Sequence, residues 1–145
     1  MHPKLPFPHL VLGAIFAFAS VAPALADPTN VPLDTDTTVN GIPVACTGVG
    51  ESKLNPHWNT YGVRVEFSGP GGELLGDETL TITDAKGAEV VSVACEGPWI
   101  LLTLPQGTYR VEGRLTGTET KPQTGYFKPS PSGQSRLELS FPDAS

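Results

Sequence analysis

Residues 102–111 read LTLPQGTYRV, and this stretch joins an apolar run to an alternating run through a turn. Pro105 presets φ for the second position of a turn, and Gly107 is expected to supply a positive φ that other residues resist. After the turn, Tyr109 and Val111 alternate with charged residues, which predicts that both side chains point into a core. The stretch is therefore expected to be scaffold between two core strands.

The same form recurs on both sides of this stretch, as short runs of β-forming residues followed by Gly, Pro, Asn or Asp. Residues 61–68 alternate most cleanly, with Val, Val and Phe on one face and Arg, Glu and Ser on the other. Residues 99–104 are apolar on both faces and are expected at the centre of a sheet. Pro122 interrupts residues 118–128, which are expected at an edge. The other expected strands are residues 42–49, 78–83, 89–95, 108–115 and 136–141.

This spacing of strands and turns predicts an all-β protein with a seven- to eight-stranded antiparallel β-sandwich, and it leaves the strand order open. No helical period appears after residue 38. Residues 39–145 are expected to form a single domain. The polar residues 27–38, here called the leader, are expected to be flexible or extended and to lie outside the core.

Residues 1–26 have the features of a secretory signal peptide. A weakly basic start is followed by an apolar stretch of roughly ten residues and by the sequence ALA at residues 24–26, which predicts cleavage after Ala26. The apolar stretch is shorter than the roughly 20 residues that span a bilayer. We therefore expect an exported chain, periplasmic or secreted, with no integral membrane segment after cleavage.

The charge balance narrows the choice of partner. Cleavage would leave 119 residues (145 minus 26) and would remove one of the nine basic residues, Lys4. The remaining 8 basic and 15 acidic residues give a net charge of −7. An acidic chain is not expected to bind nucleic acid, because phosphates require clustered Lys and Arg.

Cys46 and Cys95 are the only two cysteines, and both lie in apolar, strand-like runs. In an oxidising compartment, a single pair without CxxC spacing indicates a structural disulfide. Closing a loop of about 50 residues would add on the order of 4 kcal/mol in the chain-entropy account. Trp99 is expected to pack against this disulfide. A redox or metal-binding pair would need a further partner residue nearby, and the sequence offers none.

The stretch LPQGTYRVEG at residues 104–113 follows the apolar strand PWILLT and resembles the L-P-x-G-x-Y-x-V turn of transthyretin-like (prealbumin-like) β-sandwiches. It is similar especially to the carboxypeptidase regulatory-like domains of bacterial exported proteins. The strand rhythm matches over most of residues 40–142, but the motif covers only about ten residues. The related hydroxyisourate hydrolases use paired histidines, an arginine and a C-terminal Tyr-Arg-Gly-Ser. This chain has one histidine after residue 26, His57, and ends in FPDAS, so that activity is not expected.

Other catalytic and metal sites lack part of their residue sets. A Ser-His-Asp site would depend on His57, and no GxSxG sequence is present. Zinc needs three or four closely spaced ligands, which one histidine and two distant cysteines do not supply. Asp34, Asp36 and Asn40 recur at even spacing, but the Gly and bidentate Glu of a calcium loop are missing. We therefore expect no enzyme activity, no cofactor and no bound metal.

Aromatic residues carry the remaining functional signal. The candidate binding loop contains His57, Trp58 and Tyr61, and Arg64 follows it on the next expected strand. If Trp58 and Tyr61 are exposed together, they would stack on a sugar or anchor a partner. In the alternative interpretation, Trp58 closes one end of the sandwich as a plug.

Two classes of function remain open. The first, which we favour, is a non-catalytic interaction module that binds another protein of the envelope through end loops or through an edge strand such as residues 120–128. The second is a small-molecule or carbohydrate-binding domain that uses His57, Trp58, Tyr61 and Arg64. The identity of the partner or ligand and the oligomeric state are not predicted.

Overall fold

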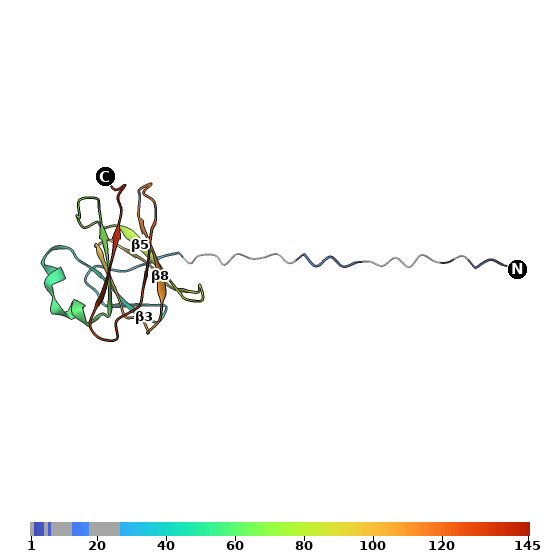
Figure 1. Cartoon of the computed structure of the whole chain (residues 1–145), viewed down its shortest axis with the longest axis horizontal. Coiled ribbons are helices and arrows are strands. Elements are labelled where there is room, and N and C mark those ends of the chain that lie inside the picture. The colour runs from blue at the N-terminus through green and yellow to red at the C-terminus, as the bar shows by residue number, and fades with distance from the viewer. Residues whose placement is uncertain (1, 5, 7–12, 18–26) are drawn as a thin grey trace.

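The computed structural model describes residues 2–4, 6, 13–17 and 27–145 (Figure 1). In these residues the chain forms ten strands and two short 3-10 helices, with no α-helix. Two mixed sheets of five strands each pack face to face as a β-sandwich, so the predicted all-β class is confirmed. Ala26 and most of the predicted signal peptide lie outside the described residues.

The two sheets are called sheet A and sheet B. Sheet A has the order β1-β6-β5-β8-β9. Its strands are β1 (Thr29–Asn30), β5 (Glu78–Asp84), β6 (Glu89–Cys95), β8 (Tyr109–Leu115) and β9 (Gln123–Phe127). Sheet B has the order β10-β4-β7-β3-β2. Its strands are β2 (Thr37–Val39), β3 (Ile42–Thr47), β4 (Val63–Ser68), β7 (Trp99–Leu102) and β10 (Ser135–Ser140).

The eight runs expected from the sequence correspond to β3 through β10, with β7 at the centre of sheet B and β9 at an edge of sheet A. Two parallel pairs correct the expected antiparallel sandwich of seven or eight strands. Strand β10 runs parallel to β4, with Ser135 opposite Val63, and β1 runs parallel to β6, with Thr29 opposite Val93. Side-chain alternation has the same period in parallel and antiparallel strands, so it does not reveal strand direction.

The leader belongs to both sheets, which corrects the expectation that it lies outside the core. Its first half forms β1 on sheet A, and its last residues begin β2 on sheet B. Val31 is 5% exposed and packs in the core. The leader is held by backbone bonds, from Val31 N to Ala94 O at 3.0 Å and from Asp34 N to Cys46 O at 2.8 Å. Backbone hydrogen bonds do not require a periodic pattern of apolar side chains, so the polar sequence of the leader gives no sign of them.

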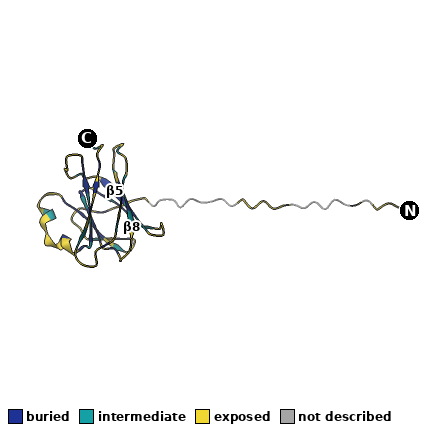
Figure 2. Ribbon diagram, viewed as in Figure 1, coloured by how far each residue is buried: buried dark blue, intermediate teal, exposed yellow. Residues whose placement is uncertain are grey.

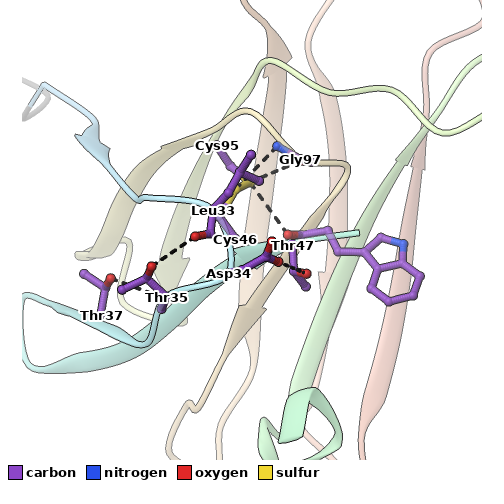
Figure 3. Close-up of a disulfide and its surroundings, with 9 residues drawn as sticks. Leu33, Asp34, Thr35, Thr37, Cys46, Thr47, Cys95 and Gly97 are labelled. Atoms are coloured by element: carbon purple, nitrogen blue, oxygen red, sulfur yellow. Dashed lines mark hydrogen bonds between the residues drawn. A yellow bond between two sulfur atoms is a disulfide. The ribbon is translucent and has the colours of Figure 1, made fainter. Parts of the chain in front are cut away.

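The core lies between the sheets and is formed by the inward-facing side chains of both, as the buried residues in Figure 2 show. A disulfide joins Cys46 on β3 to Cys95 on β6, with the Cα atoms 5.7 Å apart, so the predicted pairing is confirmed. It links one sheet to the other (Figure 3). The leader passes close to the disulfide. Leu33 forms an isolated β-bridge with Cys46, and Thr47 Oγ1 donates a hydrogen bond to Asp34 Oδ1 at 2.6 Å.

The Trp99 ring does not pack against the disulfide, which corrects the expectation from the sequence. Its neighbour Ile100 is opposite Cys46 in the ladder and is fully buried in the core, so alternation places the Trp99 ring on the outer face of sheet B. There it lies under the guanidinium of Arg64, 4.1 Å from the ring centre. Strand β7 is therefore apolar on both faces for different reasons: Ile100 packs in the core, and Trp99 packs on the outer face of sheet B.

The stretch LTLPQGTYRV carries the chain from β7 in sheet B to β8 in sheet A. The Tyr109 ring is 6% exposed, and its Oη donates a hydrogen bond to the carbonyl oxygen of Pro105 at 2.7 Å. A tyrosine bonded back to the backbone in this way is a tyrosine corner, a device of β-sandwiches at crossings between sheets. Gly107 does not have the expected positive φ; a Cβ there would lie 3.6 Å from the Tyr109 ring.

Candidate functional site

The candidate loop lies at the side of the sandwich and forms the two 3-10 helices, η1 (Gly50–Leu54) and η2 (Pro56–Thr60) (Figure 1). Asn55 caps η2, because its side chain accepts a hydrogen bond from the backbone N–H of His57 at 3.0 Å. Pro56 begins η2, at a position where a missing N–H costs nothing. The Trp58 Nε1 atom donates to the Ser52 carbonyl at 2.9 Å and so ties the two helices together.

Both aromatic rings of this loop are covered. Trp58 is 6% exposed and Tyr61 is 5% exposed, and they pack with Ala45 and Leu101. Ala45 and Leu101 are paired across β3 and β7 and form part of the outer face of sheet B. The interpretation of this loop as a stacking surface required both rings to be exposed together, and the structure does not provide this. Trp58 instead covers a face of the sheet.

The structure also brings a residue of the leader into this cluster. The His57 Nε2 atom lies 2.8 Å from Asp36 Oδ1 and 2.9 Å from Oδ2, and Tyr61 Oη donates to Asp36 Oδ1. The bond from Tyr61 and then the bond from His57 hold the pKa of the Asp36 carboxyl below its usual range. Burial and the bond to Asp36 raise the pKa of Tyr61. No local pattern signals this contact, since Asp36 lies 21 residues before His57.

Arg64 is engaged inside the molecule and is not free for a ligand. Its Nε atom lies 3.0 Å from Glu66 Oε1, and its side chain is 12% exposed. The same Glu66 oxygen accepts a bond from Arg136 on β10 at 2.6 Å. Burial lowers the pKa of the Arg64 guanidinium. Of the four predicted loop residues, only His57 keeps a substantially exposed side chain, at 46%.

The second predicted surface, the edge formed by β9, has a different character. Strand β9 pairs only with β8, from Tyr109 opposite Phe127 to Gly113 opposite Gln123. In the described part of the chain, no backbone hydrogen bond joins β9 to any other segment. Tyr126, at 69%, is among the most exposed large apolar side chains of the described residues. The strand therefore presents one free row of backbone groups beside a large aromatic ring.

Within the described residues, no helix is both long enough and apolar enough to cross a membrane. Nor does that part of the chain place three or more His, Cys, Asp or Glu side chains where they would hold a metal ion. No protein-family model matches the chain, and a search of curated proteins finds none with significant sequence similarity.

Proposed function

We propose that this protein is a non-catalytic interaction module of the cell envelope or the extracellular space, and that it binds an extended segment of a partner protein along β9. The observation that carries the proposal is the open edge of this strand. A sheet edge offers unpaired N–H and C=O groups, and partners that add a strand to it gain main-chain hydrogen bonds and side-chain specificity.

A comparison of the four sheet edges favours β9. Strands β1 and β2 are two and three residues long, which limits the number of hydrogen bonds they offer. Strand β10 has six residues, but it places Arg136 and Glu138 along its length. Strand β9 has five residues, QTGYF, none of them charged. An edge of this length without a charge lacks the usual protection against pairing.

The flanks of β9 define the width of the proposed contact. Lys121 and Pro122 precede the strand, and Lys128 and Pro129 follow it. Lysine and proline discourage strand pairing, so they confine it to the five residues between them. Tyr126 supplies an aromatic anchor, a residue type enriched at protein interfaces. The edge thus has a bounded length and a hydrophobic contact point.

We also propose that the chain is exported and is related to the transthyretin-like, carboxypeptidase regulatory-like domains. The disulfide is compatible with an oxidising compartment, and residues 1–26 have the pattern of a signal peptide. The tyrosine corner at Tyr109 lies in the stretch on which the resemblance rests. Non-catalytic accessory domains are what this resemblance implies.

The test places a photo-crosslinking amino acid at Tyr126 in the native source and, as the matched control, at Ser140 on the other long edge. We expect discrete crosslinked products from position 126 and none of them from position 140. A variant that combines Thr124→Lys with a crosslinker at position 126 should lose these products, because the added charge protects the edge. Equal crosslinking from both positions would refute the proposal. Products that contain only a second copy of this chain would replace it with self-association.

A further inference from the structure

A surface cavity of about 620 Å³ lies where β5 begins and β6 ends, beside the leader. Leader residues 30–33 form one side of it, and residues 94–96 and Thr116 contribute to the rest. Asp77 and Glu78 also line it. No residue of the candidate loop or of β9 lines this cavity, so a ligand bound there would use other residues than the function proposed for β9.

The lining is acidic. The acidic residues Asp77, Glu78 and Glu96 line it, and no Lys or Arg does. A second cavity of about 430 Å³ shares Asp77 and Thr116 with the first. It adds Glu119 and Asp143. Because no cation lines either cavity, this end of the sandwich concentrates negative charge without a countercharge in the lining.

Glu78 is the unusual member of the lining. It is 1% exposed, and neither of its carboxyl oxygens has a hydrogen-bond partner. The next two inward positions of the same strand hold Leu80 and Ile82, so an apolar residue would suit the packing at position 78. Burial and the nearby charge of Asp77 raise the pKa of Glu78 to about 9. An unpartnered buried carboxyl costs stability, and this cost indicates a role beyond packing.

We propose that this acidic cavity binds a ligand through an alkylammonium group, supplied by a free polyamine or by a lysine side chain. An ammonium group donates three hydrogen bonds. A carboxylate accepts such bonds strongly and also neutralises the positive charge. The space also favours an organic cation over a bare metal ion. A calcium ion draws its oxygen ligands to within about 2.6 Å, whereas 620 Å³ is roughly the volume of twenty water molecules.

Binding of a cation in this cavity is expected to change the protonation state of Glu78. Without a ligand, Glu78 is protonated at neutral pH, because its pKa is about 9. A positive charge in the cavity favours the ionised carboxylate, so binding is expected to release a proton from Glu78 into the solvent. Both Glu78 oxygens are buried in the free protein, so the bound ammonium reaches them through a local movement of the lining and then gives them the partner that they lack.

Isothermal titration calorimetry of the purified chain tests the proposal with cadaverine and with the peptide acetyl-Gly-Lys-Gly-amide. The same peptide acetylated on its lysine is the neutral control. We expect saturable binding of at least one amine, no binding of the acetylated peptide, and release of about one proton per amine in buffers of different ionisation enthalpy. Tighter binding of cadaverine would identify a free polyamine as the ligand, and tighter binding of the peptide would identify a lysine side chain.

Three variants separate the site from general charge effects. Asp77→Asn combined with Glu96→Gln should weaken binding by about tenfold or more. Asn tolerates the φ of 57° found at position 77, so the loop should be preserved. Glu78→Gln should abolish proton release, and Glu51→Gln, on exposed η1, should change nothing. The proposal is overturned if neither amine binds, if the double variant binds as the wild type does, or if calcium chloride binds and the amines do not.

Discussion

Tyr109 stabilises the crossing between the sheets in two ways. Its ring is buried and stacks on Phe127 of β9 with the ring centres 5.7 Å apart. Its hydroxyl is bonded to the Pro105 carbonyl at the other side of the turn. The ring therefore contributes apolar burial, and the hydroxyl fixes the path of the backbone.

Replacement of Tyr109 by Phe should isolate the second contribution. We expect the free energy of unfolding to fall by about 1 kcal/mol, the usual net value of such a hydrogen bond. Urea denaturation of the two proteins measures this difference. Tyr126→Phe is the matched control, since its side chain is exposed and its loss of a hydroxyl should leave stability unchanged. Equal effects of the two substitutions would contradict the role given to the corner.

Glu78 should make the stability of the protein depend on pH. Its carboxyl stays protonated in the folded chain up to a pKa of about 9, whereas the ordinary value is 4.5. Between these values the folded state holds a proton that the unfolded state has lost. The free energy of unfolding should therefore fall as the pH rises through this window, by at most about 1.4 kcal/mol per pH unit.

Glu78→Gln should remove this contribution, because an amide does not titrate. We expect a flatter stability profile from about pH 5 to about pH 9 and a more stable protein at the alkaline end. Thermal unfolding across the range measures both effects, with Glu51→Gln as the exposed control. A variant that keeps the slope of the wild type would show that Glu78 is not the responsible group.

At the scale of single elements, the loop formed by η1 and η2 acts as a cover for sheet B. Trp58 occupies the outer face over Ala45 and Leu101, and Gln134 donates to the carbonyl oxygens of Trp58 at 2.9 Å and Tyr61 at 3.0 Å. The loop is thus held from the side of the sheet and from the segment before β10.

Trp58→Ala should therefore cost stability, by about 3–5 kcal/mol as for other buried aromatic residues. His57→Ala, at a half-exposed position of the same loop, should have a much smaller effect. Chemical denaturation followed by circular dichroism compares the two. If Trp58→Ala is as stable as His57→Ala, the ring does not serve as a cover and the binding-loop interpretation regains support.

Strands β3 to β10 were predictable from the sequence because apolar side chains recur in short runs and Gly, Pro, Asn or Asp residues separate them, whereas the short strands β1 and β2 were not predicted. The disulfide was predictable because only two cysteines exist. The contact between Asp36 and His57 was not, since it joins a polar segment to a loop across a sheet edge. The parallel pairing of β1 with β6 and of β10 with β4 could not be predicted for a similar reason, because strand direction depends on long-range backbone hydrogen bonds and not on a local sequence pattern. Burial of Glu78 depends on neighbours from other strands.

At the scale of the whole molecule, the disulfide joins the two sheets. Cys46→Ala combined with Cys95→Ala should lower the free energy of unfolding by on the order of 4 kcal/mol, because the unfolded chain loses its cross-link. Urea denaturation measures the difference. The wild type under reducing conditions should behave like the double variant. Thiol titration of the unfolded, non-reduced protein should find no free thiol, and two free thiols would contradict the cross-link.

The leader has a consequence for the order of assembly. Thr29 pairs with Val93, so the first strand of the sandwich needs β6, which is made much later. Contacts between such distant segments form slowly, because the intervening chain must first be closed into a loop. In a chain made from its N-terminus, β1 must therefore wait for β6 before it can pair. Until β1 docks, Val31 and the edge of β6 stay uncovered, so the newly made chain exposes an apolar side chain and an unpaired strand edge in that interval.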